Sequence, residues 1–456
     1  MVNAHPEKQP IQKRENNMNK ITVIGAGLAG CEAAYAAAQL GVQVDLIEMK
    51  PLKKSPAHKT DNFAELVCSN SLKANRVESA AGLLKQEMRI LGSVCLEAAD
   101  ISAVPAGGAL AVERNIFSEY ITNKIKNHPN INIINQVVEK LPQNEICIVA
   151  TGPLTDGVLA NEIERLTGEG NLSFYDAAAP IVTVDSVDFS SAFVASRYDR
   201  DETGEGDYIN CPMNKDEYEA FHNELINAEG APLHEFDKQL KVYEGCMPIE
   251  VLARRGADSI RFGPLKPVGL RDPRTGHRPW AVVQLRKENR DGTLYNLVGF
   301  QTNLKFGEQK RVFSMIPALK NAEFMRYGVM HRNSFINSPK ILNRDLSLKK
   351  SDNIFFAGQL SGVEGYMESA ASGIIAAINA VNKLLGKPAL ILPKFTMIGA
   401  LLDYITDETI SDFQPMGANF GVLPALDVHI RDKKERYAAL AKRSLDYFNN
   451  IGELDI

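Results

Sequence analysis

The 456-residue sequence predicts an α/β fold, in which a parallel sheet is interrupted by an inserted α+β domain. Three observations support this fold class. An apolar strand at 20–24 runs into a glycine-rich turn and then into an alanine-rich helix. A second apolar stretch, at 42–48, ends in an acidic residue. A third, at 353–360, contains a glycine near its end and precedes a helix of small residues at 374–385.

The glycine-rich turn has the spacing of a dinucleotide-binding Rossmann domain, Gly25-Ala26-Gly27-Leu28-Ala29-Gly30. Gly25 permits the tight turn, Gly27 lets the backbone approach a pyrophosphate, and Gly30 lets the helix pack closely on the strand. We expect the phosphates at the helix N-terminus, where free N–H groups and the helix dipole favour negative charge. The alternative is a structural turn, which the strand-turn-helix-strand context disfavours.

The second strand ends in Glu48, close to the spacing of about 20 residues at which such domains bind ribose hydroxyls. An acid at this position suits the unphosphorylated adenosine ribose of FAD or NAD and repels a 2′-phosphate. The sequence contains one Gly-x-Gly-x-x-Gly only. Any nicotinamide cofactor is therefore expected to dock on the face of the first cofactor and not in a Rossmann domain of its own.

Two later segments indicate that the first cofactor is a flavin. The strand at 146–149 ends in Ala150-Thr151-Gly152, a turn that recurs in flavoprotein dinucleotide domains. The segment after Asn353 resembles the C-terminal flavin motif of glutathione-reductase-like proteins. Its expected cofactor-binding residues are Gly358, Gln359, Gly365 and Tyr366. Gln359 replaces the acid usual in that motif, which weakens the expected contact with the ribityl chain.

This chain order implies a glutathione-reductase-like FAD-binding Rossmann domain built from both ends of the sequence. We expect residues 20–184 and 336–456 to form it, and residues 185–335 to form the inserted α+β domain. Residues 1–19 are polar and predict a disordered N-terminal extension without the apolar core of a secretory signal. No apolar run reaches the roughly 18 residues that span a bilayer. A cytoplasmic protein without a membrane partner is expected.

The cysteines predict neither a metal site nor a disulfide framework, because they lack CxxC or other ligand spacing. They are Cys31, Cys68, Cys95, Cys147, Cys211 and Cys246. Free thiols are the natural state of such cysteines in the cytoplasm. We expect Cys31, Cys95, Cys147 and Cys211 to be small buried side chains.

The formal net charge of −5 does not suggest nucleic acid, but charge is unevenly distributed along the insertion. Residues 199–237 carry twelve acidic and two basic side chains, whereas residues 250–290 carry ten basic and four acidic ones. Pro, Gly, His277 and the only tryptophan interrupt the basic run, as in a binding loop. We predict an RNA-backbone footprint there, with two solvated faces of one domain as the alternative. The footprint is assigned to Arg254, Arg255, Arg271, Arg274, Arg278, Trp280 and Arg286.

Four motifs together resemble the folate- and FAD-dependent tRNA (uracil-5-)-methyltransferases, the TrmFO family. They are the glycine-rich turn, ELVCSNSLK at 65–73, YEGCMPIE at 243–250 and GQLSGVEGY at 358–366. The resemblance runs from about residue 19 to the C-terminus. The two catalytic cysteines of the family match Cys68 and Cys246.

The resemblance implies methylation of carbon 5 of the T-loop uridine in tRNA. Methylenetetrahydrofolate would supply the carbon, FAD would carry it and supply electrons, and NAD(P)H would reduce the flavin again. A thiolate that adds to carbon 6 makes carbon 5 nucleophilic, and a second group must then remove the proton from carbon 5. Cys68 is favoured as the nucleophile and Cys246 as the base, and the reverse assignment stays open.

The uridine must be flipped out of its stack to reach a flavin. Trp280, Tyr366 or Phe262 are candidates to stack on the base or on the folate ring. The alternatives are the same chemistry on a ribosomal RNA uridine, the larger FAD and folate enzyme that modifies wobble uridine, and a generic FAD oxidoreductase without RNA affinity. A flavin-bearing RNA-binding scaffold is a further alternative, which the two cysteines disfavour.

Overall fold

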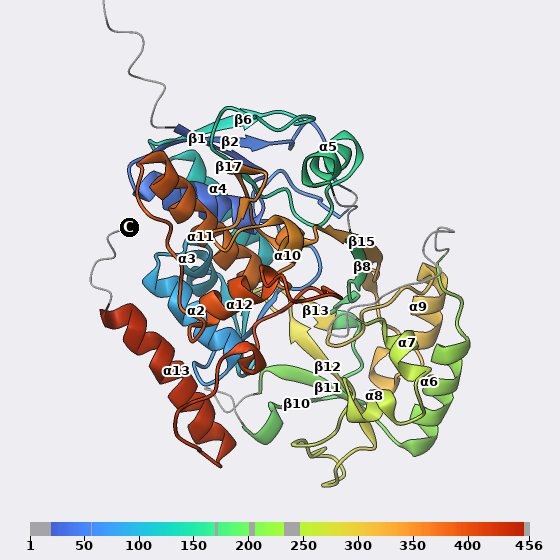
Figure 1. The fold of residues 1–456 in the computed structure, drawn as a ribbon. Coiled ribbons are helices and arrows are strands. Elements are labelled where there is room, and N and C mark those ends of the chain that lie inside the picture. Colours follow the sequence, from blue (N-terminus) through green and yellow to red (C-terminus); the bar gives the residue numbers. More distant parts are fainter. Residues whose placement is uncertain (1–19, 56, 169–171, 200–205, 232–246, 451–456) are drawn as a thin grey trace, which may run out of the picture.

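The computed structural model describes residues 20–55, 57–168, 172–199, 206–231 and 247–450. Figure 1 shows two bodies, one formed by both ends of the chain and one by its middle. Cys246 lies outside the described residues. None of the helices in these ranges is both long enough and apolar enough to cross a membrane.

The first body contains a six-stranded sheet in the order β16-β17-β7-β1-β2-β6. Its strands are β1 (Lys20–Ile24), β2 (Gln43–Glu48), β6 (Ile131–Asn135), β7 (Cys147–Val149), β16 (Ser347–Leu348) and β17 (Ser351–Phe356). All neighbouring pairs are parallel except β16 and β17. In β7, Ile148 pairs with Val23 on one side and with Phe355 on the other. The sheet therefore joins the N-terminal and C-terminal thirds of the chain, as predicted for a Rossmann-type FAD-binding fold.

Two helices from opposite ends of the sequence pack together on this sheet, α1 (Leu28–Gln39) and α11 (Tyr366–Leu384). A Cβ atom on Gly373 would lie 2.2 Å from the carbonyl oxygen of Ala29, so glycine is needed for this close approach. The sequence predicts the second of these helices over 374–385, but α11 begins at Tyr366. The earlier start matters because it places Tyr366 in the first turn of the helix, where its hydroxyl contacts the loop that contains Cys68.

The remaining helices of this body contribute to two separate apolar clusters. They are α2 (Ala80–Ile90), α3 (Val94–Ile101), α4 (Arg114–Lys126), α5 (Gly157–Thr167), α10 (Ser338–Ile341), α12 (Met397–Ile405) and α13 (Lys433–Asn450). A small sheet of β3 (Ser71–Ala74), β4 (Ala103–Val104) and β5 (Ala109–Val112) follows the Cys68 loop.

The second body is an antiparallel sheet in the order β10-β11-β12-β13-β9-β14. Its strands are β9 (Ile181–Thr183), β10 (Phe193–Val194), β11 (Tyr208–Met213), β12 (Ala281–Lys287), β13 (Leu294–Leu297) and β14 (Phe324–Arg326). The helices α6 (Lys215–Asn227), α7 (Ile249–Ala253), α8 (Ser259–Phe262) and α9 (Phe306–Phe313) share its apolar core. We call this body the insertion; its first strand, β9, precedes residue 185.

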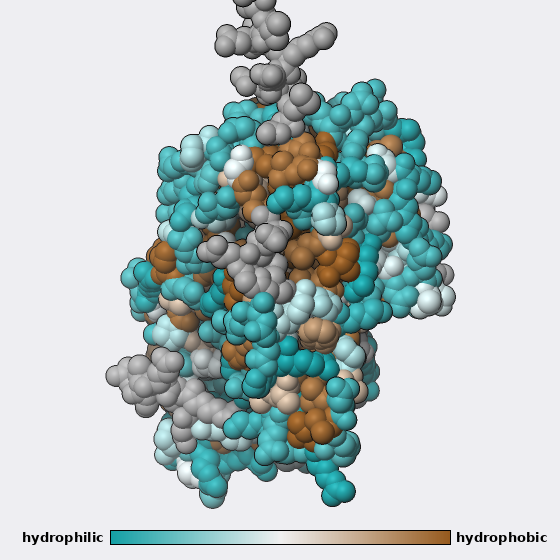
Figure 2. Space-filling model, turned by 60° about the vertical axis from the view of Figure 1, so that its left-hand side comes forward, coloured by the Kyte–Doolittle hydropathy of each residue, from teal (hydrophilic) through white to brown (hydrophobic). Residues whose placement is uncertain are grey.

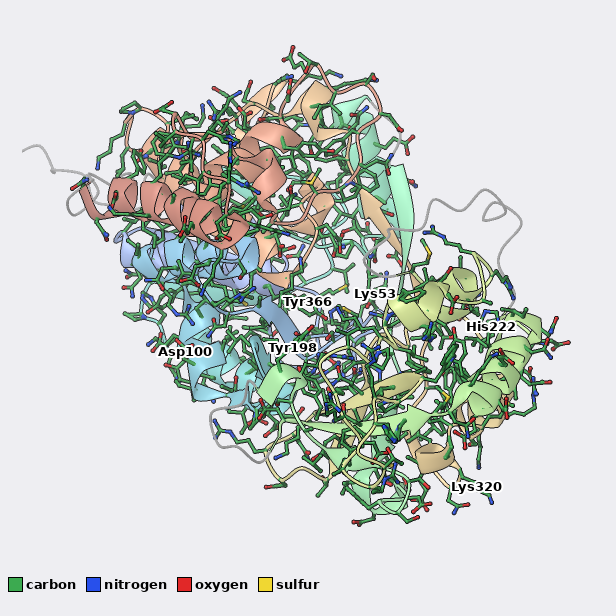
Figure 3. The ribbon with its side chains drawn as sticks, turned by 90° about the horizontal axis from the view of Figure 1, so that it is seen from below. Lys53, Asp100, Tyr198, His222, Lys320 and Tyr366 are labelled. Atoms are coloured by element: carbon green, nitrogen blue, oxygen red, sulfur yellow. The ribbon has the colours of Figure 1, made fainter. Side chains whose placement is uncertain are left out.

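Two strands connect the bodies, β8 (Leu172–Ala177) and β15 (Met330–Phe335), which pair antiparallel along their whole length. On the face drawn in Figure 2, apolar side chains form separate patches within a mostly hydrophilic surface. Figure 3 places Tyr366 between the two bodies, while His222 and Lys320 lie at the far side of the insertion.

Candidate active site

The glycine-rich turn has the geometry of a phosphate cradle. Gly25 has φ +98°, and a Cβ atom on Gly30 would lie 1.7 Å from the carbonyl oxygen of Gly25. A Cβ atom on Gly27 would meet no atom within 4 Å, so this position is open on its outer side. Two of the three glycines are thus required by the chain itself, and the third leaves room for a ligand. The turn fits a dinucleotide pyrophosphate.

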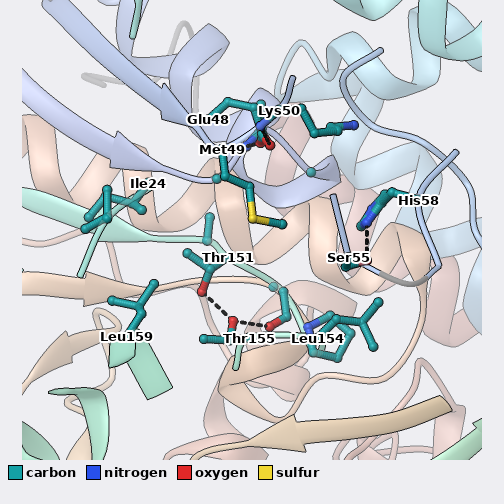
Figure 4. A pocket seen from close by; sticks show the side chains of 18 of the residues that line it. Ile24, Glu48, Met49, Lys50, Ser55, His58, Thr151, Leu154, Thr155 and Leu159 are labelled. Carbon is teal, nitrogen blue, oxygen red and sulfur yellow. Dashed lines mark hydrogen bonds between the residues drawn. The ribbon is translucent and has the colours of Figure 1, made fainter. Parts of the chain in front are cut away.

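A cavity begins at this turn and encloses about 1500 Å³ of space not occupied by atoms, part of it open to solvent. Its lining comes from β1, β2, the turn after β7, the start of α5 and the segment after β17 (Figure 4). The lining includes the predicted residues Gly25, Ala26, Gly27, Leu28, Ala29, Glu48, Gly358, Gln359 and Tyr366. Gly30 and Gly365 are not in the lining, and a Cβ atom on either would lie within 2.2 Å of another atom of the chain.

Glu48 is buried at the end of β2 and faces the cavity with its carboxylate. One oxygen accepts a hydrogen bond from the N–H of Ala26 at 2.6 Å, and the other accepts from the N–H of Lys50 at 2.9 Å. The carboxylate therefore ties the second strand to the glycine-rich turn. Its position in the lining is compatible with the predicted contact to a ribose.

Sequence reasoning missed the polar residues of the loop after β2. Lys53, Ser55 and His58 line the cavity, and Ser55 Oγ lies 2.6 Å from His58 Nδ1 (Figure 4). Burial, and then the nearby Lys50, lower the pKa of His58. Lys53 Nζ lies 3.2 Å from Asp156 Oδ1 at the edge of the cavity. Neither glycine spacing nor apolar periodicity marks such residues, because they stand in an irregular polar loop.

Cys68 follows Val67, which lines the cavity, and is itself half-buried and held by Tyr366, which lines the cavity too. The Tyr366 hydroxyl accepts hydrogen bonds from the N–H of Cys68 at 2.8 Å and of Ser69 at 3.2 Å, and its oxygen lies 2.8 Å from Cys68 Sγ. Because the two N–H groups occupy the acceptor positions of the phenol oxygen, its single hydrogen points to the sulfur. Burial, followed by the charge of Cys68, raises the pKa of Tyr366, so the phenol keeps this hydrogen.

Residues of the insertion hold the same loop from the opposite side. Arg326 donates to the carbonyl oxygen of Val67 at 2.5 Å. Arg286 donates to Asn70 Oδ1 at 2.8 and 3.1 Å and to Ser69 Oγ at 3.2 Å. The Asn70 amide in turn donates to the carbonyl oxygen of Lys287 at 2.9 Å. The Ser-Asn pair after Cys68 therefore serves as a docking point between the two bodies.

Arg286 differs from the other basic residues assigned to RNA. It is 7% exposed, and burial lowers the pKa of its guanidinium. Its guanidinium is bound to Asn70, so Arg286 is poorly placed to contact RNA phosphates. A run of charges in sequence does not show which members face inward.

The other predicted RNA-binding side chains lie in the loops and short helices before β12. Arg254, Arg255, Arg271, Arg274 and Arg278 are exposed. Arg274 is paired with Asp272, at 2.9 and 2.7 Å, so part of its charge is neutralised. The guanidinium of Arg261 stacks on the half-buried Trp280 ring at 3.7 Å, and the neighbouring Phe262 is 71% exposed.

The segment that follows Cys246 is anchored firmly. The N–H of Ile249 donates to the carbonyl oxygen of Gln301 at 2.7 Å. Buried Glu250 accepts from Thr302 Oγ1 and from the N–H of Asn303, both at 2.8 Å. The place of the Cys246 thiol relative to Cys68 stays a prediction. The remaining cysteines, Cys31, Cys95, Cys147 and Cys211, are fully buried, and burial raises the pKa of each thiol.

Within the described ranges, no group of three His, Cys, Asp or Glu residues is arranged to hold a metal ion.

Comparison with known proteins identifies the family. The profile of the family described as "Glucose inhibited division protein A" matches residues 20–388. A Methylenetetrahydrofolate--tRNA-(uracil-5-)-methyltransferase TrmFO of Acetivibrio thermocellus is 59% identical over 425 residues, covering 93% of this chain and 97% of that protein. Proteins of the same name from Staphylococcus epidermidis and Staphylococcus aureus are 55% and 56% identical, covering 94% of this chain and 98% of theirs.

Among solved structures, Aquifex aeolicus GidA in its form II crystal superimposes with a TM-score of 0.69 at 18% identity, covering 96% of this chain and 74% of that one. The form I crystal gives 0.66 at 20% identity over 85% of this chain and 69% of that one. At such identities the likeness concerns the fold, which agrees with the predicted FAD-binding α/β architecture. On the extent and level of its sequence identity, the chain belongs to the TrmFO family.

Proposed function

We propose that this protein methylates carbon 5 of the T-loop uridine in tRNA in the cytoplasm, with methylenetetrahydrofolate as the carbon donor. The observation that carries the proposal is the 55–59% identity, over more than nine-tenths of each chain, to relatives named for that reaction. The Cys68 loop, whose Val67 lines the dinucleotide cavity, supports it, because the chemistry needs a thiol beside a flavin.

The cavity suits FAD, because it contains a glycine-rich turn that can receive a pyrophosphate and polar residues that can bind the rest of the cofactor. The turn at 25–30 would hold the pyrophosphate, Glu48 the ribose, and Gly358 and Gln359 the flavin end near Tyr366. When bound and reduced by NAD(P)H, FAD supplies the electrons that turn a methylene group into a methyl group. The chain itself has to bind the cofactor, hold the uracil and move protons.

Two thiols would perform the steps at the uracil ring. A thiolate adds to carbon 6, and the electron pair of the C5–C6 double bond makes carbon 5 a nucleophile for the one-carbon unit. A base then takes the proton from carbon 5 as the bond between the methylene group and its carrier breaks. The methylene group gains the equivalent of a hydride, which bound and reduced FAD would supply, and the thiolate leaves carbon 6 as the ring double bond forms again. Cys68 and Cys246 are the proposed pair, with Cys68 favoured as the nucleophile.

The RNA would lie against the insertion, in keeping with the expectation that residues 185–335 form an RNA-binding domain. Arg254, Arg255, Arg271, Arg274 and Arg278 are exposed and can contact phosphates. Trp280, braced by Arg261, offers a ring on which an unstacked base can rest. The target uridine has to be flipped out to reach Cys68 between the two bodies.

The test is to incubate unmodified tRNA and ribosomal RNA separately with the FAD-loaded protein, labelled methylenetetrahydrofolate, and NADH or NADPH. Label in 5-methyluridine at the T-loop position is expected. Label at a wobble uridine or in ribosomal RNA alone would replace the proposed target. Flavin turnover without labelled RNA would leave a generic oxidoreductase.

A further inference from the structure

The Cys68 loop belongs to the FAD-binding body, but its nearest cationic partner comes from the insertion. Arg326 is the last residue of β14, at the edge of the second sheet, and its guanidinium binds the carbonyl oxygen of Val67 at 2.5 Å. The side chain is half-buried between the two bodies. A guanidinium stays charged in proteins, so this contact carries a positive charge to the peptide that precedes Cys68.

Two other arginines near the loop, Arg114 and Arg286, are held by an ion pair or by hydrogen bonds. Arg114, from α4, forms an ion pair with Glu288, which follows β12, and donates to the carbonyl oxygen of Leu66 at 2.8 Å. Arg286 is bound to Ser69 and Asn70.

Arg326 instead interacts electrostatically with the Cys68 thiol and with the Tyr366 phenol, as well as with Glu288 and Arg114. Burial, and then the charge of Arg114, lower the pKa of its guanidinium, while Glu288, Tyr366 and Cys68 act in the opposite direction. Its charge is therefore poorly hydrated, and it is bound to the carbonyl group that directly precedes Cys68.

We propose that Arg326 is a positioning residue for Cys68, which fixes the Val67 peptide and places a positive charge beside the sulfur so that Cys68 reacts as a thiolate when the insertion is docked. The hydroxyl of Tyr366 lies 2.8 Å from the same sulfur, and its hydrogen is available for that contact. A thiolate is favoured by both a nearby cation and a hydrogen-bond donor.

The inference rests on the proposed function only for the use of the thiolate. Either role open to Cys68 requires that form, because a nucleophile attacks as the thiolate and a base must be deprotonated before it accepts a proton. The arrangement also makes the reactivity of Cys68 depend on contact between the two bodies, since the loop and the cation reside on different ones.

The experiment measures the rate of Cys68 alkylation by iodoacetamide against pH in the FAD-loaded full-length protein, with the Cys68 peptide quantified by mass spectrometry. Arg326→Gln keeps a donor for the Val67 carbonyl and removes the charge, whereas Arg326→Lys keeps the charge. In Arg326→Gln the alkylation midpoint is expected to rise by about one pH unit, so that alkylation below the midpoint slows about tenfold. Arg326→Lys is expected to restore most of the rate.

Arg311→Gln is the matched control, because Arg311 lies on α9 in the same body and pairs with Glu224 and Glu308 at the surface. It is expected to leave the alkylation profile unchanged. Flavin absorbance shows that each variant is folded and loaded. A profile of Arg326→Gln that coincides with the wild-type profile would overturn the proposal, and so would an equal shift in Arg311→Gln.

The assay needs no RNA, so it separates this inference from the proposed function. If Cys68→Ser still methylated tRNA, Cys68 would lose its proposed role in methylation, while the alkylation result would still decide whether Arg326 controls the thiol.

Discussion

The hydroxyl of Tyr366 lies 2.8 Å from the sulfur of Cys68, although the two residues are separated by 298 positions in the sequence. Tyr366 begins α11 and also lines the dinucleotide cavity, whereas Cys68 stands in the loop before β3. The contact therefore fixes a half-buried thiol next to two residues that line the cavity, Val67 and Tyr366. Four of the other cysteines are fully buried and have no such setting.

Replacing either proposed catalytic cysteine by alanine should abolish methyl transfer without loss of FAD. Cys68→Ala and Cys246→Ala each remove a thiol that the uracil chemistry needs, and neither is expected to disturb the glycine-rich cradle. The measurement is transfer of labelled carbon to tRNA together with flavin absorbance. Cys211→Ala, a change in the core of the insertion, is the control that should stay active. Activity in a proposed catalytic variant would remove that residue from the mechanism.

Tyr366→Phe should slow methyl transfer at least tenfold while FAD stays bound. The ring is kept, but the N–H groups of Cys68 and Ser69 lose their acceptor, at a cost of about 1–3 kcal/mol for an unsatisfied buried group. Single-turnover rates on tRNA give the comparison. Tyr404→Phe is the control, because it removes a tyrosine hydroxyl that donates to the Gln414 carbonyl oxygen, and it should leave the rate near the wild-type value. Equal rates for the two variants would argue against a role for the hydroxyl.

Replacing Gly30 by alanine should impair folding, whereas replacing Gly27 by alanine should impair FAD binding. Gly30→Ala places a Cβ atom 1.7 Å from the Gly25 carbonyl and should destabilise the whole domain. Gly27→Ala meets nothing in the chain, so the protein should fold with nearly wild-type stability but bind FAD at least tenfold more weakly. Thermal unfolding without FAD and flavin titration separate these outcomes. Gly108→Ala, also without neighbours, is the control. Unchanged FAD affinity in Gly27→Ala would place the pyrophosphate elsewhere.

Stability should depend on pH through Glu87, whose pKa burial raises to about 7. This carboxyl accepts from the N–H groups of Met397 and Ile398 and from Ser444 Oγ. Because the folded pKa exceeds the unfolded one, the folded state binds more protons, and the contribution present below about pH 4 is lost as pH rises through 7.

Glu87→Gln mimics the protonated form and should remove this dependence. Chemical unfolding at pH 5 and at pH 8 is the measurement. Relative to the variant, the wild-type protein should lose on the order of 1–3 kcal/mol of unfolding free energy between the two pH values. A constant difference between wild type and variant would show that Glu87 does not titrate in this range.

Binding of tRNA should weaken steeply with salt, because phosphate contacts release counterions. Changing Arg254, Arg255, Arg271 and Arg278 together to glutamine should reduce the slope of log affinity against log salt by about 1 for each residue that touches a phosphate. Arg311→Gln is again the control. Filter binding over a salt series gives the slopes, and an unchanged slope would place the RNA on another surface.

The sequence by itself determined the parts of the protein that depend on local backbone geometry. The spacing of Gly25, Gly27 and Gly30, and the acid that ends β2, predict the cradle, because a tight turn and a close helix impose the same requirements wherever they occur. The parallel sheet followed from the same pattern. The family resemblance added Cys68 and Cys246 as candidates, but it did not show how a thiol is held.

Only the tertiary structure decided how the Cys68 loop is positioned. Arg286 and Arg326 come from strands more than 200 residues away, and nothing near them in sequence marks them as partners of Val67, Ser69 or Asn70. Arg286 belongs to a basic run that suggests a solvent-facing RNA contact, yet its side chain is buried and donates hydrogen bonds to Asn70. The physical reason is that a local motif is set by the torsion angles of adjacent residues, whereas the direction of a charged side chain depends on which distant surface packs against its strand.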